Sequence, residues 1–447
     1  MSRLFVSAGK ATKRHKRSLR FGVTRGLGLV AALSLGWQCW YVTTVLLSSR
    51  DGKGSGENID HSLPSSAMQY VRYNKRGKEV MHRIHTVRLD DLRDLTDDYL
   101  VQLKRSNNQT LVSYQEASTG KHVLLQELHQ SGISRMDLPT VQLLPTWSQV
   151  AQLYYQHAKP DTCEPIIFGI ERCRAFATKH VTRQSFLATA GLYNTGTNAL
   201  TYYLRANLRM KDNPLWDGIL VQVPWHKHWF VHQRESHTIP YLSNVTLSTV
   251  LPIVTVRDPL SWAQSMCEQP YDVEWTQTGK VAPPQCPSLS QGDASVRLPK
   301  QTGETVYRDL FHLWNEWYSA YLEAAAGDHL DFVIVRHEDL LYCPRQVLSK
   351  LQECSGASWK HKDGSFVYVM DQAKWEHARL SGRAQSNRVS AMIKHGHGQA
   401  RRRRHLTQGD FRPRLDKKTG KYVSIINETL LNLFSYRLPT HWNDWKS

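Results

Sequence analysis

The residues best suited to chemistry form a short polar turn between two apolar segments. The turn reads Asn194-Thr195-Gly196-Thr197-Asn198. An apolar, β-prone run ends just before it, and leucines recur every four residues after it, which is the spacing of one helix face. In a strand–turn–helix unit, the backbone N–H groups of the turn and the positive end of the helix dipole face one anion. The turn is therefore a candidate phosphate cradle, to which Thr195 and Thr197 would add two hydroxyls.

The residue that follows the second glycine of this turn separates it from the loop of nucleotide triphosphatases. Their loop reads GxxxxGK[ST], and its lysine reaches the β- and γ-phosphates. Here that position is Thr197, so the lysine is missing. The turn therefore argues against an ATPase or a kinase and favours another phosphate ester. A plain connection between a strand and a helix is the alternative interpretation.

Two later segments have a similar organisation. Residues 251–267, LPIVTVRDPLSWAQSMC, are an apolar strand that ends in Arg257, then a turn and a helix that carries Ser265. A guanidinium offers a planar fork of donors, and a hydroxyl on a helix adds another. Residues 332–348, FVIVRHEDLLYCPRQVL, are a strand followed by Arg336, Glu338 and Asp339, for which we expect a structural role.

Together the three segments resemble the sulfotransferase family, whose donor is 3′-phosphoadenosine 5′-phosphosulfate. Family members often read GxxKxGTxxL where this chain reads GLYNTGTNAL, and the segments follow one another in family order between residues 185 and 354. The resemblance implies an α/β fold with a P-loop-type, mostly parallel sheet flanked by helices. It also implies that residues 194–198 bind the 5′-phosphosulfate and that Arg257 and Ser265 bind the 3′-phosphate. The chemistry requires no metal.

The chain departs from the family pattern at Asn194, where many members have lysine. That lysine neutralises charge that develops on the oxygen of the leaving group. Losing one such donor costs about 2.7–4 kcal/mol of transition-state stabilisation. Either another cation substitutes for it, or the protein is an inactive relative that only binds the nucleotide or a glycan.

A substitute cation occurs nearby, in the run ILVQVPWHKHWF. A strand expected over Gly218–Val223 precedes the His226-Lys227-His228 triplet. Residues beyond the carboxyl end of a parallel strand line the ligand crevice of such sheets. We therefore expect His226 or His228 to be the base that deprotonates the acceptor and Lys227 to supply the missing charge. The triplet also resembles the Lys/His pair of cytosolic sulfotransferases. A solvated polar turn is the alternative.

The net charge of +18 is concentrated at the two ends of the chain. Residues 1–25 carry eight Lys and Arg and no acid, and residues 374–421 carry fourteen against three acids. The chain between them is close to neutral, so we expect no nucleic-acid partner. The basic run at 382–406 is either a solvated arm or a loop that closes over the donor or grips a polyanionic acceptor.

An apolar segment follows the first basic end. Residues 26–47 contain no charged side chain. This segment is long enough for a membrane-spanning helix. Eight cations before it predict a cytoplasmic N-terminus. We therefore expect a single-pass type II signal anchor in the Golgi membrane with a luminal catalytic domain. A cleaved signal peptide is the competing interpretation, but its apolar core would be shorter.

These observations divide the chain into five regions. We expect a basic cytoplasmic tail at 1–25, the anchor at 26–47, a stem and uncharacterised luminal region at 48–145, the P-loop-type domain at 146–360 and a basic region at 361–447. Helices are expected at 90–104 and 147–158. The aromatic residues of 304–326 form a broad apolar face that is typical of a buried core helix.

The cysteines agree with an oxidising lumen. Of the seven, Cys39 lies in the expected anchor and six follow it. Fifteen pairings are open, and pairing of sequence neighbours is the simplest: Cys163 with Cys173, Cys267 with Cys286 and Cys343 with Cys354. Three N-x-T glycosylation sequons occur, at Asn108, Asn244 and Asn427.

The leading hypothesis is a sulfotransferase that acts on a hydroxyl, on a glycan by the inferred location. A non-catalytic nucleotide or glycan binder is the second hypothesis, supported by Asn194. A glycosyltransferase is the third, but the D-x-D metal motif typical of that class does not occur in the sequence. The acceptor and the sulfated position stay open.

Overall fold

The computed structural model describes a subset of the chain: residues 67–73, 79–88, 116–133, 135–155, 163–180, 184–210, 213–276, 295–303, 305–327, 330–369, 388–398, 414–415, 422–423 and 426–437. The expected tail (1–25), anchor (26–47) and helix at 90–104 lie outside these residues. Among the helices that the structure describes, none has the length and apolar character needed to cross a bilayer.

The central sheet carries the site. Within the described residues it has five strands in the order β4 (Ile167–Phe168), β12 (Val333–Arg336), β8 (Val250–Val256), β5 (Phe186–Gly191) and β7 (Ile219–Leu220). All neighbours are parallel except β4, which pairs antiparallel at one edge. The prediction of a mostly parallel sheet is confirmed. The expected strand at 218–223 is shorter than predicted.

The two central strands are buried along their whole length. Every residue of β5 and β8 is buried, as expected for parallel strands covered on both faces. Alternate side chains enter two different apolar clusters: Leu187 and Ile253 point to one, Ala188 and Val254 to the other. The period-2 geometry of a strand therefore builds two cores, one on each face of the sheet.

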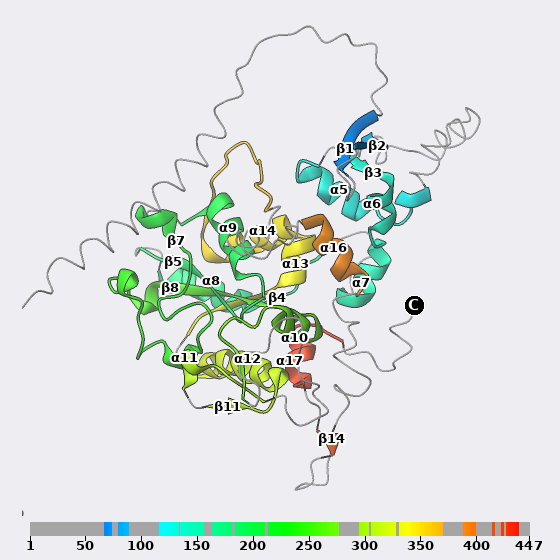
Figure 1. The fold of residues 1–447 in the computed structure, drawn as a ribbon. Helices are drawn as coiled ribbons and strands as arrows, with labels where there is room; N and C mark the ends of the chain where they lie inside the picture. Colours follow the sequence, from blue (N-terminus) through cyan, green and yellow to red (C-terminus); the bar gives the residue numbers. More distant parts are fainter. Residues whose placement is uncertain are drawn as a thin grey trace, which may run out of the picture. The chain divides into compact units, whose positions relative to one another are not determined.

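Helices cover both faces (Figure 1). The first core is closed by α8 (Ile170–Lys179), α9 (Thr197–Asn207) and α14 (Pro344–Ser355). The second is closed by α10 (Pro259–Glu268) and α12 (Leu310–Ala326). The fold is thus α/β with helices on either side of the sheet, as predicted.

The aromatic residues of α12 belong to the core. Trp314, Trp317, Tyr318 and Tyr321 are all fully buried. The tryptophan and tyrosine rings pack against each other along the helix, with centroids 4.8–4.9 Å apart. The prediction that this stripe is a core face is confirmed.

A smaller unit of strands and helices precedes the sheet. It consists of β1 (Ala67–Tyr73), β2 (Glu79–Arg88), α5 (His122–Gln130), β3 (Arg135–Asp137), α6 (Leu138–Leu143) and α7 (Trp147–Tyr154). The three strands pair antiparallel. The helix α7 begins at the residue predicted for it, and Thr146 caps it with a reciprocal bond to Gln149.

The other described elements are short. The strands are β6 (Leu208–Arg209), β9 (Glu274–Trp275), β10 (Val296–Arg297), β11 (Val306–Tyr307), β13 (Ser358–Trp359), β14 (Arg414–Leu415) and β15 (Tyr422–Val423). The helices are α11 (Pro299–Thr302), α13 (His337–Tyr342), α16 (Arg388–Gly396) and α17 (Glu428–Leu433), with 3-10 turns η1 (Leu215–Gly218), η2 (Val231–Gln233), η3 (Pro240–Leu242) and η4 (Leu247–Thr249).

The disulfides differ from the predicted local pairing. Cys163 pairs with Cys343 and Cys173 with Cys354, with Cα atoms 6.0 and 5.4 Å apart. The prediction was wrong because α8 packs directly on α14, which brings together cysteines about 180 residues apart. Cys267 is also disulfide-bonded. Its expected partner, Cys286, lies outside the described residues.

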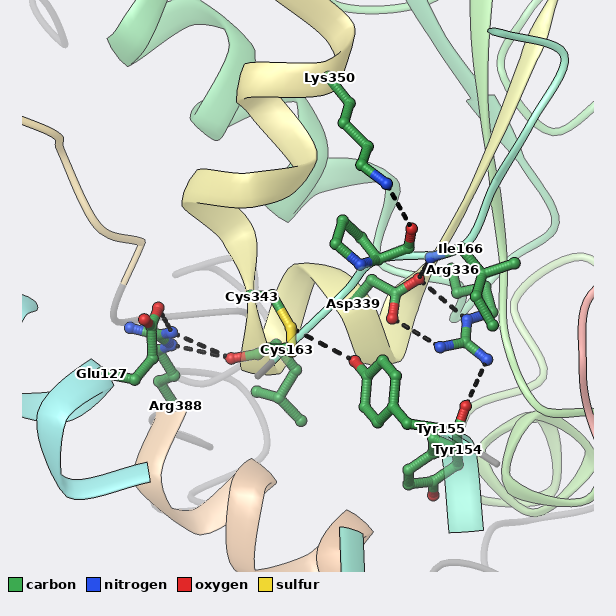
Figure 2. Close-up of a disulfide and its surroundings, with 12 residues drawn as sticks. Glu127, Tyr154, Tyr155, Cys163, Ile166, Arg336, Asp339, Cys343, Lys350 and Arg388 are labelled. Carbon is green, nitrogen blue, oxygen red and sulfur yellow. Dashed lines mark hydrogen bonds and ion pairs between the residues drawn. A yellow bond between two sulfur atoms is a disulfide. The ribbon is translucent and has the colours of Figure 1, made fainter. Parts of the chain in front are cut away.

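A buried ion pair holds β12 and α13 beside one of these disulfides (Figure 2). Arg336 donates to both oxygens of Asp339, at 2.9 and 2.7 Å, and to the carbonyl of Tyr154 at 2.8 Å. Asp339 also accepts the backbone N–H of Ile166. Glu338 accepts from the backbone N–H of Asp258 and from a tyrosine hydroxyl. These contacts fit the structural role expected for the segment.

Candidate functional site

The polar turn joins β5 to α9, as the sequence predicts. The strand ends at Gly191, whose N–H donates to the carbonyl of Lys227 at 2.8 Å. The helix begins after Gly196, which has a left-handed φ of 88°. A side chain on Gly196 would overlap the imidazole of His337. Glycine is therefore required at this position by backbone conformation and by space.

The side chain of Asn194 is turned toward α10. This residue also has a left-handed conformation, with φ of 62°, which asparagine tolerates better than most residues. Its Nδ2 donates to the carbonyl of Gln269 at 2.8 Å and lies 3.2 Å from the carbonyl of Ser265. The amide therefore fastens the turn to the end of α10 and does not replace a catalytic cation.

The two threonines of the turn are both buried, and they differ from expectation. The Thr195 hydroxyl donates to the carbonyl of Leu192 and shares a 2.7 Å hydrogen bond with the hydroxyl of Thr255. This hydroxyl faces the core, so Thr195 would contribute to a phosphate cradle through its backbone and not through its side chain. Thr197 is the first residue of α9, so its backbone N–H is one of the unpaired donors of the helix N-terminus.

Two residues of the HKH triplet lie against the turn. Lys227 Nζ donates to Asn198 Oδ1 at 2.6 Å. His228 Nδ1 lies 2.6 Å from the carbonyl of Gly191, and its ring is 4.2 Å from that of Tyr193. Since a carbonyl can only accept, Nδ1 carries the proton of the neutral imidazole. Nε2 is then the nitrogen that can take a proton, which is the orientation a general base needs.

His226 is oriented differently. It has a left-handed φ of 73°, and its ring packs against Trp229 and His237, with centroids 4.8 and 5.6 Å away. Burial, and then the neighbouring His237, lower its pKa. The triplet therefore supplies two residues to the turn and one to an aromatic cluster.

Arg257 brings the second predicted segment to the same site. It follows β8, is 7% exposed, and donates from NH1 to the carbonyl of Asn194 at 2.9 Å. Ser265 lies on α10 and is half-buried, with its carbonyl at the Asn194 amide. The turn, the guanidinium and the helix that carries the serine therefore meet where β5 and β8 end.

The surroundings of Arg257 include no direct ion-pair partner among the described residues. Its NH2 is 3.1 Å from Nε2 of His395, and its Nε has no hydrogen-bond partner. Among the described residues, no carboxylate forms an ion pair with it. Burial lowers its pKa, although the charge of Glu338 acts in the opposite direction. A buried cation without an ion-pair partner is costly, and such groups mark binding sites for the opposite charge.

Two histidines of this site were not predicted from the sequence. His337 follows β12 as Arg257 follows β8, so its position at a strand end was a usable signal. His395 lies on α16, about 140 residues along the chain from Arg257, and no local pattern identifies it. The two rings have centroids 5.3 Å apart.

A polar and aromatic wall stands beside His228. The Tyr193 ring stacks on Tyr271, with centroids 5.2 Å apart. Its hydroxyl donates to Asp272 at 2.9 Å and accepts from Gln301 at 3.1 Å. Burial and Asp272 raise the pKa of Tyr193, so this hydroxyl stays protonated. The wall therefore packs one side of His228 and holds its ring in place.

The donor set around the turn suits an anion. It consists of backbone N–H groups, a guanidinium, a lysine and imidazoles. In the part of the chain that the structure describes, no group of three or more His, Cys, Asp or Glu side chains could hold a metal ion.

In comparisons with known proteins, no family model matches the chain, and no curated protein matches it significantly. The assignment of a function therefore depends on the chemistry of the site itself.

Proposed function

We propose that the protein is a sulfotransferase that moves a sulfuryl group from 3′-phosphoadenosine 5′-phosphosulfate to a hydroxyl, on a glycan. The observation that carries the proposal is the hydrogen bond from Arg257 to the backbone of Asn194. It joins two segments, 63 residues apart in the sequence, to which the resemblance assigns the two phosphate groups of one nucleotide.

The residues present fit this donor. The N-terminus of α9, an eleven-residue helix, offers unpaired N–H groups and the positive end of its dipole to the 5′ end. At the other end, Arg257 is a buried cation with an unpartnered Nε. A dianionic phosphate would satisfy both the charge and the donor.

The chemistry follows from the two residues beside the turn. When bound, the nucleotide supplies an activated sulfuryl group with a phosphate as leaving group. The acceptor oxygen forms a bond to sulfur, the bond from sulfur to the bridging oxygen breaks, and His228 Nε2 takes the acceptor proton. Lys227 neutralises the charge that develops on the bridging oxygen, in place of the lysine absent at Asn194. His226 is the weaker candidate base, because its ring packs in an aromatic cluster.

A second function is favoured by one observation. Asn194 is uncharged and is bound to α10, and Lys227 is already bound to Asn198, so the lysine that would neutralise the leaving group is engaged by a side chain of the turn. A protein that binds the nucleotide or a glycan without transfer would have the same arrangement. Movement of Lys227 from Asn198 to the leaving group distinguishes the enzyme from the binder.

We infer a luminal location in the Golgi membrane, with residues 26–47 as the anchor. The two disulfides join α8 and its preceding segment to α14 and to Cys343, the residue just before it, and such bonds persist in oxidising compartments. Asn244 is an exposed residue of an N-x-T sequon, in a loop after η3.

Transfer of labelled sulfate to a panel of polysaccharides tests the proposal. We expect Lys227→Ala to reduce turnover by about 10²–10³-fold and His228→Ala by about 10²–10⁴-fold. His226→Ala is the matched control and should keep most of the activity. Donor binding, measured by thermal shift with adenosine 3′,5′-bisphosphate, should persist in all three variants. Stabilisation of the parent without transfer to any acceptor would favour the binder.

A further inference from the structure

The cluster around Arg257 contains two imidazoles whose protonation the structure constrains. His395 Nε2 lies 3.1 Å from Arg257 NH2. A guanidinium has only donors, so this nitrogen must accept, and His395 is therefore neutral with its proton on Nδ1. His337 is 5% exposed, and its Nδ1 has no hydrogen-bond partner. Burial and then Arg257 lower its pKa to about 3. In this structure the cluster thus consists of one cation and two neutral imidazoles.

Both imidazoles are held firmly in place. His337 is packed against Gly196, at the first turn of α9. His395 is positioned by α16, which is anchored by Arg388, a fully buried residue that pairs with Glu127 at 2.7 Å and donates to the carbonyl of Leu341 (Figure 2). The hydroxyls of two tyrosines also bind carbonyls of this helix. The histidines therefore belong to a built site and not to a loose surface.

We propose that His337 and His395 are further ligands of the 3′-phosphate at Arg257, and that the site takes up a proton when this phosphate binds. The inference rests on the proposed function, because it concerns the same nucleotide. A phosphate oxygen can accept from Arg257 and from a protonated imidazole together. The incoming dianion reverses the electrostatic penalty that keeps the imidazoles neutral. His395 then changes from an acceptor of the guanidinium to a donor of the phosphate.

The other charged groups that face the cluster are each engaged in contacts of their own and are not the groups to which we assign this proton. Glu338 has both oxygens engaged, by the Asp258 N–H and the Tyr436 hydroxyl. Glu268 on α10 pairs with Lys394 on α16 at 3.7 Å. Asp258 caps α10 by accepting from the N–H of Ser261. Tyr154 donates its hydroxyl to the His395 carbonyl. The imidazoles are the groups whose charge the phosphate would change most.

The sign of the pH dependence follows. The pKa of His337 is low before binding and would be higher beside a bound phosphate, so a proton is taken up at any pH between the two values. Affinity for the nucleotide should therefore increase as the pH falls through the pKa of the bound state. The phosphate itself loses its second proton at about pH 6. Above about pH 7.5 it is already a dianion, so it contributes little to the proton uptake.

Calorimetric titration of the full-length protein with adenosine 3′,5′-bisphosphate tests the inference. The measurement is made at about pH 7.5, where the phosphates are dianionic, in Tris and in HEPES, whose heats of ionisation differ. We expect the binding heat to differ between buffers, with uptake on the order of one proton per nucleotide. Adenosine 5′-monophosphate, which lacks the 3′-phosphate, should show no uptake.

Variants show which histidine takes up the proton. His395→Gln keeps an acceptor for Arg257 and a donor for phosphate but cannot titrate, and His337→Asn removes the second imidazole. Each should reduce the uptake, and the double variant should abolish it. His361→Gln is the matched control, because His361 binds the carbonyl of Ala206 at the opposite end of α9. Thermal melting of each variant checks that it is folded.

Three results would overturn the inference. Binding by the parent with the same heat in both buffers would show that no proton is taken up. Equal uptake with the monophosphate would assign the imidazoles to the 5′ end. Unchanged uptake in the double variant would assign the proton to another group. A parent protein that binds no nucleotide at all would instead overturn the proposed function, and this inference with it.

Discussion

Asn194 is the residue at which the chain departs most from the pattern it resembles, and the structure gives that residue a different task. Its amide binds two carbonyls at the end of α10. A lysine there would lose these bonds and would occupy a left-handed conformation, which costs about 1–2 kcal/mol for residues other than glycine and asparagine. The charge that the family places in the turn would therefore come from Lys227, across the turn on the next connection.

Asn194→Ala tests the fastening role. Two hydrogen bonds are lost and alanine must adopt a positive φ, so we expect a loss of about 1–3 kcal/mol in the free energy of unfolding. Asn194→Gly, which removes the same bonds without the conformational cost, should lose less. Urea denaturation of both variants measures the difference. Equal losses would show that the conformation of residue 194 carries no cost.

The buried His337 predicts acid sensitivity in the absence of nucleotide. Its folded pKa of about 3 lies below the ordinary histidine value, so the unfolded chain binds the extra proton as the pH falls. Stability should therefore be complete above about pH 6.5 and decline below it, by about 2 kcal/mol at about pH 5 from this residue. His337→Asn should flatten this slope in chemical denaturation at several pH values. An unchanged slope would assign the loss to other groups.

At the scale of elements, the two disulfides and α16 determine how the strand ends are held. Cys173 and Cys354 join α8 to α14 on one face of the sheet. The helix α16 covers the end of β8, where His395 meets Arg257. Each of these connections joins segments that are distant in the sequence, and so fixes their positions relative to one another.

Removal of the Cys173–Cys354 bond should destabilise the domain. The bond closes a loop of 181 residues, for which a native disulfide is worth about 2–5 kcal/mol. We expect Cys173→Ser with Cys354→Ser to lower the melting temperature in non-reducing buffer. In reducing buffer, where the parent has lost the bond as well, the melting temperatures of the variant and the parent should be similar. A parent whose melting is insensitive to reductant would contradict the pairing.

Detachment of α16 should weaken nucleotide binding without touching the turn. Arg388→Ala leaves Glu127 buried without its partner, and breaking a buried pair in this way costs about 3–5 kcal/mol. Arg388→Met with Glu127→Gln removes both charges and serves as the milder variant. We expect weaker binding of adenosine 3′,5′-bisphosphate and unchanged binding of adenosine 5′-monophosphate. Equal weakening of both nucleotides would indicate general unfolding.

The elements that the sequence predicts are those with a local cause. The turn at 194–198, the strands before Arg257 and His337, and the core face of α12 follow from apolar runs and their periods. The disulfide pairing, the direction of the Asn194 amide and the place of His395 depend on contacts between distant segments. A single sequence does not encode those contacts in any local pattern, so the corresponding predictions were wrong or absent.

At the scale of the whole molecule, the unequal distribution of charge bears on what the protein binds. The basic ends, 1–25 and 374–421, flank a nearly neutral chain, and within the second of them α16 contributes His395 to the candidate site. The C-terminal region is thus part of the nucleotide site that we propose. A chain truncated before residue 388 should lose affinity for the 3′-phosphate.

Competitive binding of adenosine 3′,5′-bisphosphate and adenosine 5′-monophosphate to the full-length protein tests the central claim most directly. If the turn and Arg257 hold the two ends of one nucleotide, the bisphosphate should bind tighter by at least about tenfold, a difference of about 1.4 kcal/mol. Arg257→Gln should remove this preference while the monophosphate still binds. Equal affinity for the two nucleotides, or no binding of either at millimolar concentration, would contradict the claim.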